Sequence, residues 1–312
     1  MARGTSPHVA VIPDHPHRRS GIAAGLFRSL RPEQWSKNLL VFAGLLFARR
    51  LFDLPSVLTA LAAFMIFCAL SGTVYLVNDI ADRESDRTHP LKSRRPIASG
   101  RVPVTLAFAT AATLAVAALL GSIALGWRFA LVAAGYLVLN VMYSMVLKHV
   151  VILDVLTIAI GFVLRASAGA IAIDVEISHW LFVCTILLAL FISLAKRRHE
   201  LVLLQSGAKE HRPILDEYSS YLLDQMICIA AGASLIAYVL YTINPENAEK
   251  FGTPWLDLTI PFPIYGIFRY LYLVHRRDGG GSPSDLLLSD FPLLACVVSW
   301  VAAVVVIIYL RP

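Results

Sequence analysis

The sequence predicts an all-α membrane protein whose helices cross the bilayer several times. Hydrophobic residues fill 57% of the 312 positions and charged residues only 15%. The mean hydropathy is +0.69, which ordinary soluble domains do not reach. Apolar stretches of about 20 residues, the length that a helix needs to cross the hydrocarbon core of a bilayer, follow one another with short polar breaks. These three observations predict a multi-pass helical fold.

Two parts of the chain are expected, residues 1–37 and residues 38–312. The first 20 residues contain histidines, prolines and arginines and lack the apolar core of a signal peptide, which indicates a disordered cytoplasmic tail. Residues 21–30 place their large apolar side chains near one helical face, so a helix along the membrane surface is expected there. Residues 38–312 are predicted to form the transmembrane domain.

Nine apolar stretches are predicted to span the membrane. In chain order they cover residues 38–53, 56–79, 103–121, 128–147, 151–172, 179–195, 221–242, 256–274 and 289–310. The first stretch is short and ends in Arg49 and Arg50, so it requires a tilted helix or arginine side chains that extend to the membrane surface. Tryptophans near the span ends support these limits, because interfacial positions are typical of this residue: Trp35, Trp127, Trp180 and Trp255.

Basic residues are distributed unequally over the two sides of this topology. With the N-terminus inside, twenty Lys and Arg residues fall in cytoplasmic segments and five in outside segments. Because cytoplasmic loops carry the excess of Lys and Arg, the N-terminus and the polar stretch 78–100 are predicted to face the cytoplasm. The net charge of +6 follows from these loops and gives no reason to expect binding to nucleic acid.

The second span ends in four polar side chains at helical spacing: Asn78, Asp79, Asp82 and Asp86. At about 100° per residue, these side chains share one side of a helix with Ser71 and Tyr75. Three carboxylates in one place repel each other at a membrane edge unless a cation lies among them. Mg²⁺ prefers oxygen ligands and is usually held by one or two carboxylates and substrate phosphates, so a Mg²⁺ site is predicted. The alternative is a solvated helix end whose charges pair with Arg83 and Arg87.

This motif, followed by RPIASG at residues 95–100, resembles the UbiA superfamily of membrane transferases. The resemblance implies nine helices around a central cavity that opens sideways to lipid, with the active-site loops on the cytoplasmic side. It also implies that Asp-rich helix ends bind Mg²⁺ and the diphosphate of a donor. Carried over residue by residue, Asn78, Asp79, Asp82 and Asp86 are the expected metal ligands, and the three aspartates are the expected catalytic residues.

The chain departs from this family pattern after the sixth span. Prenyltransferases of the superfamily carry a second Asp-rich motif there, whereas this chain has KRRHEL at residues 196–201. A second basic cluster favours a donor with more phosphate than a prenyl diphosphate has. Phosphoribosyl pyrophosphate fits, because its separate 5-phosphate requires a clamp of Lys and Arg side chains.

Four stretches resemble the decaprenyl-phosphate phosphoribosyltransferase branch of the superfamily, from actinobacteria: RPEQWSKN, HPLKSRRP, YSMVLK and KRRHE. That branch makes decaprenylphosphoryl 5-phosphoribose, a precursor for cell-wall arabinan. The resemblance therefore implies an enzyme of the bacterial plasma membrane whose substrates are phosphoribosyl pyrophosphate and a polyprenyl phosphate lipid. The sequence gives no prenyl chain length and leaves the oligomeric state, including a homo-oligomer, open.

Further residues are expected to bind the substrates, most of them in basic loops or at cytoplasmic span ends: Lys37, Asn78, Lys92, Arg94, Arg95, Tyr143, Lys148, Asp154, Arg165, Lys196, Arg197, Arg198 and Glu200. Tyr143 and Lys148 could each reach a phosphate oxygen; the alternative is an interfacial tyrosine and an ordinary loop lysine. Arg165 lies inside the fifth span, where an ionisable residue is a functional candidate. A substrate phosphate and a structural partner both fit it.

The predicted reaction needs no general base, because a lipid phosphate is already ionised near neutral pH. It is a single displacement at the anomeric carbon with inversion, in which Mg²⁺ and basic side chains stabilise the departing pyrophosphate. The alternative is a prenyltransferase that moves a prenyl group from a prenyl diphosphate to an aromatic acceptor such as 4-hydroxybenzoate. A transporter is disfavoured, since the charges gather at one membrane face and not at the midplane.

Overall fold

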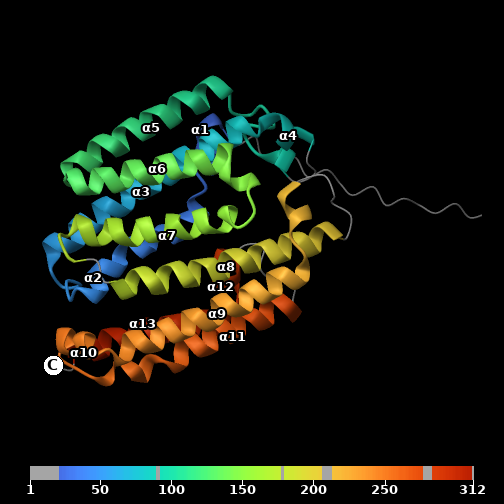
Figure 1. Cartoon of the computed structure of the whole chain (residues 1–312). Coiled ribbons are helices and arrows are strands. Elements are labelled where there is room, and N and C mark those ends of the chain that lie inside the picture. The colour runs from blue at the N-terminus through green and yellow to red at the C-terminus, as the bar shows by residue number, and fades with distance from the viewer. Residues whose placement is uncertain (1–20, 89–91, 177–178, 206–212, 277–282, 311–312) are drawn as a thin grey trace, which may run out of the picture.

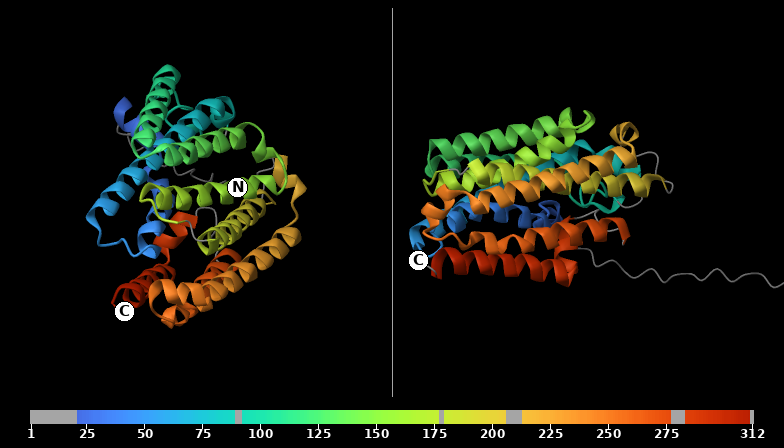
Figure 2. Two further views of the ribbon diagram at one scale, coloured as in Figure 1. Left: turned by 60° about the vertical axis from the view of Figure 1, so that its left-hand side comes forward. Right: turned by 60° about the horizontal axis from the view of Figure 1, so that its bottom comes forward.

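The computed structural model describes residues 21–88, 92–176, 179–205, 213–276 and 283–310. Within these ranges the chain forms helices and no strand, so the all-α prediction is confirmed. The long helices lie side by side in one bundle (Figure 1), and Figure 2 shows the same bundle from two further sides.

Seven of the described helices are long and apolar enough to cross a membrane, which confirms a multi-pass membrane protein. They are α3 (Leu54–Ala81), α5 (Val104–Ala124), α6 (Trp127–Met145), α7 (Leu153–Ala172), α8 (His179–Gln205), α9 (Ser220–Ile243) and α13 (Phe291–Val305), which the turn η6 (Val306–Leu310) continues. Each corresponds to one predicted span, although α8 continues well beyond the predicted end at residue 195.

The first predicted span, 38–53, is not a single long helix. It is divided between a 3₁₀ helix, η1 (Pro32–Phe42), and the short α2 (Ala43–Phe47). A 3₁₀ helix rises about 2.0 Å per residue, more than the 1.5 Å of an α-helix. The eleven residues of η1 therefore extend about 22 Å along the bundle, where they pack against α3 and α7.

The eighth predicted span, 256–274, is also interrupted. It is divided between the 3₁₀ turn η5 (Trp255–Thr259) and α11 (Pro261–Arg276), a helix of 16 residues. Pro261 explains the division, because a proline lacks the N–H that would continue the preceding turn as a helix. The prediction of nine spanning helices is thus confirmed for seven of them.

Short elements lie at the ends of the bundle. Figure 1 shows α4 (Arg83–Thr88) at one end and α10 (Pro245–Phe251) at the other. The other short elements are α1 (Ile22–Ser29), η2 (Lys92–Arg94), η3 (Leu147–His149), η4 (Pro213–Glu217) and α12 (Pro283–Ser289). Because successive long helices alternate in direction, the C-terminal ends of α3, α6 and α8 and the N-terminal ends of α5, α7 and α9 meet at the α4 end.

The segment η1 approaches α7 closely at Gly169. A Cβ atom built on Gly169 would lie 1.8 Å from the carbonyl oxygen of Val41, well inside van der Waals contact. Gly44 meets the backbone of Ala170 in the same way, at 3.0 Å. Glycine at these positions therefore allows η1 and α2 to pack directly on the backbone of α7.

Substitution of Gly169 by alanine is expected to lower the free energy of unfolding by about 1–3 kcal/mol, because the backbone of η1 must move away from the new methyl group. Gly232 in α9 is the matched control: no atom lies within 4 Å of a Cβ built there. Gly232→Ala is expected to raise stability by up to about 1 kcal/mol through helix propensity. Thermal unfolding of the detergent-solubilised variants measures both effects, and equal Tm values would contradict the tight contact.

Candidate active site

The α4 end of the bundle carries the predicted acidic cluster. Asp79 lies near the end of α3 and Asp86 lies in α4, and both residues are only 2% exposed. The prediction that all four polar residues share one continuous helix is wrong, because α3 ends at Ala81 and α4 begins at Arg83. The residue between them, Asp82, has φ −88° and ψ 7°, outside the helical region. The four side chains form two groups, which differ in their partners.

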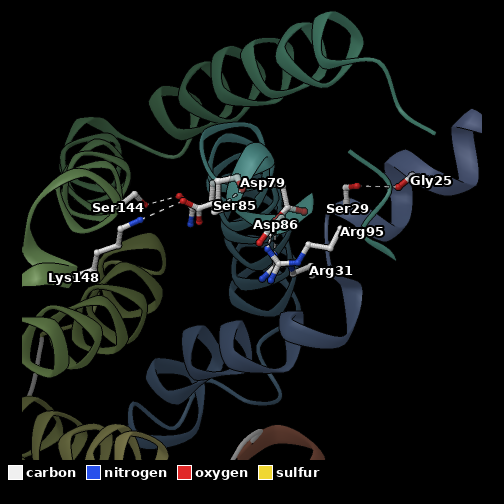
Figure 3. Close-up of polar contacts among 11 residues, drawn as sticks. Gly25, Ser29, Arg31, Asp79, Ser85, Asp86, Arg95, Ser144 and Lys148 are labelled. Carbon is white, nitrogen blue, oxygen red and sulfur yellow. Dashed lines mark hydrogen bonds and ion pairs between the residues drawn. The ribbon is translucent and has the colours of Figure 1, made fainter. Parts of the chain in front are cut away.

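Asp79 and Asp86 form the first group, the carboxylate pair, with two arginines (Figure 3). Nη1 of Arg95 lies 2.6 Å from Oδ2 of Asp86 and 3.2 Å from Oδ1 of Asp79. Nη2 of Arg31 lies 2.6 Å from the same oxygen of Asp79. Because a buried carboxylate is costly without a counter-charge, the two guanidinium groups stabilise both buried anions.

Arg31 is a site residue that the sequence did not single out. Its backbone has φ 52° and ψ 64°, in the left-handed region that few residues other than glycine adopt. Its guanidinium carbon lies 4.7 Å from the centroid of the Tyr75 ring, a cation–π distance. The contact with Asp79 joins residues 48 positions apart, which no local pattern shows. The sequence did predict a polar face on α3 that includes Tyr75, and this face was the one feature that could have indicated a partner such as Arg31.

The turn at residues 95–103 places Arg95 over the carboxylate pair. Ile97 is fully buried and packs against α3 and α5, which fixes the turn to the bundle. Nε of Arg87 donates a hydrogen bond to the carbonyl of Ala98 at 3.2 Å and ties the turn to α4. The packed turn formed by the RPIASG sequence therefore holds Arg95 in place.

Asn78 and Asp82 form the second group, whose partners, Ser144 on α6 and Lys148 in η3, are labelled in Figure 3. The hydroxyl of Ser144 donates to Oδ1 of Asn78 at 2.5 Å, and Nζ of Lys148 lies 3.5 Å from Oδ1 of Asp82. The structure thus brings the predicted Lys148 to the acidic cluster. Ser144 was not predicted, because nothing in the surrounding sequence sets it apart from other polar residues at the end of a span.

These residues fit a magnesium ion by their chemistry, but their oxygens do not surround a single point. In the described ranges, no group of three or more His, Cys, Asp or Glu side chains is arranged to hold a metal ion. Asp79 and Asp86 share Arg95, whereas Asp82 faces Lys148. Carboxylate and amide oxygens are suitable ligands for Mg²⁺. The guanidinium groups of Arg31 and Arg95 supply the positive charge that balances the carboxylate pair.

Arg197 belongs to a buried network and not to an open basic cluster. Nε of Arg197 donates to Asp154 at 2.7 Å, Nη1 donates to Glu200 at 2.5 Å, and Nη2 donates to the hydroxyl of Tyr143 at 3.3 Å. The hydroxyl of Tyr218 donates to the other oxygen of Asp154 at 2.8 Å. Four predicted site residues therefore meet here, but their hydrogen bonds and charges are paired with one another.

The two neighbours of Arg197 point elsewhere. Arg198 pairs with Asp224 on α9, and Nε2 of His275 on α11 lies 3.3 Å from the same carboxylate. Nζ of Lys196 lies 3.9 Å from Glu200. The three basic residues of the KRR sequence thus have different surroundings, and the structure does not bring Arg198 to the carboxylate pair.

Arg165 lies inside α7 and is held by neutral groups. Its Nε donates to Oδ1 of Asn38 at 2.8 Å, Nη1 to the carbonyl of Gly161 at 2.8 Å and Nη2 to the hydroxyl of Tyr136 at 2.6 Å. The amide of Asn38 donates in turn to Ser71 on α3 at 3.0 Å. Among the residues that the structure describes, no carboxylate lies within 4.0 Å of this guanidinium.

Lys37 is half-buried in η1, next to Asn38. Removal of its amine from water lowers the pKa of Lys37 to about 7, and repulsion from Lys196, Arg165 and Arg31 contributes in the same direction. Asp285 on α12 acts in the opposite direction and is the weakest of these influences. Four cationic side chains from different elements therefore lie close enough to affect one another.

The remaining predicted residues, Lys92 and Arg94, lie in η2, which packs against α4. Arg94 is exposed, and its carbonyl accepts a hydrogen bond from Arg101. The structure places η2 on the surface of the α4 end, next to the turn at residues 95–103.

Comparison with known proteins gives matches over nearly the whole chain. A family model described as the UbiA prenyltransferase family matches residues 38–288. A Corynebacterium glutamicum protein named decaprenyl-phosphate phosphoribosyltransferase is 34% identical, over 99% of this chain and 94% of its own. A protein of the same name from Mycolicibacterium smegmatis is 35% identical, over 92% of this chain and 93% of its own.

The solved structures include a similar fold. A UbiA homolog from Archaeoglobus fulgidus, bound to GPP and Mg²⁺, matches with a TM-score of 0.68 over 91% of this chain and 99% of that chain. At 19% sequence identity, this match supports the fold alone, whereas the family model and the curated relatives carry the assignment. On this evidence the chain belongs to the UbiA prenyltransferase family.

Proposed function

We propose that this protein transfers 5-phosphoribosyl from phosphoribosyl pyrophosphate to a polyprenyl phosphate such as decaprenyl phosphate. The observation that carries the proposal is the similarity, over nearly the whole chain, to two relatives named decaprenyl-phosphate phosphoribosyltransferase. The product would be decaprenylphosphoryl 5-phosphoribose, for cell-wall arabinan. The α4 end supports the proposal, because carboxylates and cations gather there as a phosphorylated donor requires.

The proposed reaction forms one bond and breaks one bond at the anomeric carbon of the donor. An oxygen of the lipid phosphate attacks this carbon, and pyrophosphate leaves with the bonding electrons. The attacking phosphate is already ionised and needs no proton acceptor. Direct displacement inverts the configuration, so an α-configured donor gives a β-linked product.

The residues that would hold Mg²⁺ are Asn78, Asp79, Asp82 and Asp86. Bound Mg²⁺ would neutralise the charge that develops on the leaving pyrophosphate. Arg31 and Arg95 would then exchange carboxylate oxygens for phosphate oxygens, because a guanidinium group binds either kind of anion with the same donor geometry. Lys148, beside Asp82, would bind a further phosphate oxygen.

The proposal places the α4 end in the cytoplasm and the bundle in a bacterial plasma membrane. The excess of Lys and Arg in the segments assigned to the inside supports this orientation. The segment η1–α2 and the helix α11 pack beside the long helices. We include them as the remaining crossings of a nine-helix arrangement around a central cavity.

Turnover by the purified protein tests the proposal. With Mg²⁺, phosphoribosyl pyrophosphate and decaprenyl phosphate, the protein in lipid nanodiscs is expected to release pyrophosphate and to form a lipid with β-linked 5-phosphoribose. EDTA is expected to stop the reaction, and added Mg²⁺ to restore it. A product with retained configuration would contradict the single displacement.

An aromatic prenyltransferase is the second candidate function. The description of the matching family as prenyltransferases favours it. The region after the sixth predicted span argues against it, because its carboxylate Glu200 is already bonded to Arg197. Prenylation of 4-hydroxybenzoate from a prenyl diphosphate, without any ribosylated lipid, would establish this alternative.

A further inference from the structure

The interior of the bundle contains a positive charge that no described carboxylate balances. Arg165 is only 7% exposed, and the carbonyl, amide and hydroxyl groups that accept its hydrogen bonds are all neutral. The rings of Tyr136 and Phe162 lie 4.7 Å and 5.2 Å from its guanidinium carbon. Each guanidinium nitrogen thus donates a hydrogen bond, and the side chain is fixed in position. The contacts do not neutralise its positive charge. A buried charge without a counter-ion is costly, so an anion at this place would be stabilised.

Lys37 extends this positive region toward the α4 end. In the described part of the chain its amine makes no ion pair or hydrogen bond, and its nearest charged neighbours are mostly cations. Burial among them lowers the pKa of Lys37 to about 7. Three cations act on this amine, Arg31 before η1, Arg165 on α7 and Lys196 on α8, and Asp285 on α12 acts in the opposite direction. The segment η1 and the elements that pack against it carry further titratable groups: Glu33 in η1, Cys68, Tyr75 and Asp79 on α3, and Asp154 on α7.

The backbone of Lys37 and Asn38 lies away from the carboxylate pair along both η1 and α3. Arg31 contacts Asp79, and Lys37 follows Arg31 by six residues, about 12 Å along a 3₁₀ helix. Asn38 contacts Ser71, which precedes Asp79 by eight residues, about 12 Å along α3. A diphosphate bound at the carboxylates therefore leaves this deeper position available for another group.

We infer that Lys37, Arg165 and Lys196 form an inner basic site that binds a phosphate monoester dianion, separate from the diphosphate at the carboxylate pair. Lys37 would contact the phosphate directly, while Arg165 and Lys196 add positive charge from two other helices. Two ligands carry this chemistry: the head group of the prenyl phosphate acceptor and the 5-phosphate of the donor. The identity of these two ligands rests on the proposed function, whereas the affinity of the site for phosphate does not.

A dianion at this site changes the protonation of Lys37. The negative charge favours the ammonium form, so the pKa of Lys37 rises above about 7 when phosphate binds. At pH 8, where the free amine is mostly neutral, binding is therefore expected to take up a fraction of a proton, up to about one. A lysine with only a structural role would show no such proton uptake.

Isothermal titration calorimetry on the full chain in nanodiscs, without turnover, tests the inference. One arm compares farnesyl phosphate with farnesol in EDTA; the other compares phosphoribosyl pyrophosphate with an analogue that lacks the 5-phosphate, in Mg²⁺. The variants are Lys37→Gln and Lys37→Arg. Lys250→Gln is the matched control, since Lys250 is exposed on α10 at the opposite end of the bundle. Titration at pH 8 in two buffers of different ionisation enthalpy gives the proton uptake.

Lys37→Gln is expected to lower the affinity for one of the two phosphate ligands about tenfold or more. The affinity of this variant for the matching ligand without that phosphate is expected to stay at the wild-type value. The Lys250→Gln protein is expected to bind every ligand as the wild type does. Loss in the farnesyl phosphate arm identifies the acceptor phosphate, and loss in the donor arm identifies the 5-phosphate. Lys37→Arg is expected to keep the affinity and lose the proton uptake. Wild-type affinity of Lys37→Gln in both arms would overturn the inference. Loss of phosphate binding in a protein without transferase activity would support the site and remove only the proposed function.

Discussion

Asp79→Asn is expected to reduce turnover at least about 100-fold, because it removes one charge from the carboxylates that would hold Mg²⁺ and the leaving pyrophosphate. Asp79 is the carboxylate that both Arg31 and Arg95 contact. An amide of the same size preserves the shape of the site but cannot balance these cations. Initial rates of pyrophosphate release measure the effect, and the Mg²⁺ concentration for half-maximal rate is expected to rise.

Asp257→Asn is the control for this substitution. Asp257 is exposed in η5, and its variant is expected to keep wild-type rates. Equal Tm values for the variants and the wild type would show that Asp79→Asn folds, so that its rate reports on chemistry. Near-normal turnover of a folded Asp79→Asn protein would remove this residue from the site.

The arginines of the carboxylate pair balance the charge of two buried side chains. Asp79 and Asp86 share Arg95, and Asp79 also contacts Arg31. A buried carboxylate without such a counter-charge is costly. Under the proposed function, a magnesium diphosphate would bind by an exchange of partners, in which the carboxylates would hold the ion and the arginines would bind phosphate oxygens.

The helices and the location of the acidic cluster could be predicted because they depend on local signals. Apolar stretches of sufficient length predict spanning helices whatever their neighbours, and the described part of the chain contains seven such helices. The segments 38–53 and 256–274 are apolar as well, so composition does not distinguish them from the others. The 3₁₀ helix that packs on Gly169 depends on a tertiary contact. Pro261, in contrast, is a local signal for a helix start, and the prediction of a span at 256–274 did not use it.

Contacts between side chains of distant segments could not be predicted from the sequence. The acidic motif was recognised from spacing, but the turn at Asp82 that interrupts its helix was not predicted. The pairing of Arg31 with Asp79 joins distant segments. In the KRR sequence, residues with the same charge have opposite surroundings, because successive positions of a helix point about 100° apart. Composition showed that charge was present, and only the structure shows which charges are already neutralised.

Arg197→Met is expected to lower the free energy of unfolding by about 3–5 kcal/mol, because it leaves a buried carboxylate without its counter-charge. Arg197 is 2% exposed, and its partner Asp154 is fully buried and receives a second hydrogen bond from Tyr218. Such a loss would sharply reduce the amount of folded protein. Thermal unfolding in detergent, together with the yield of monodisperse protein, measures the effect.

The neighbouring residue provides a matched control with the same chemical change. Arg198→Met removes a guanidinium from a partly exposed pair with Asp224, and its cost is expected to stay below about 1 kcal/mol because solvent screens such pairs. If Arg197 has a structural role, the double variant Asp154→Asn/Arg197→Met, which removes both charges together, should recover part of the lost stability. If Arg197 instead binds phosphate, the single variant would keep its Tm and lose affinity for the donor. The comparison between two adjacent arginines therefore separates support of the fold from recognition of the substrate.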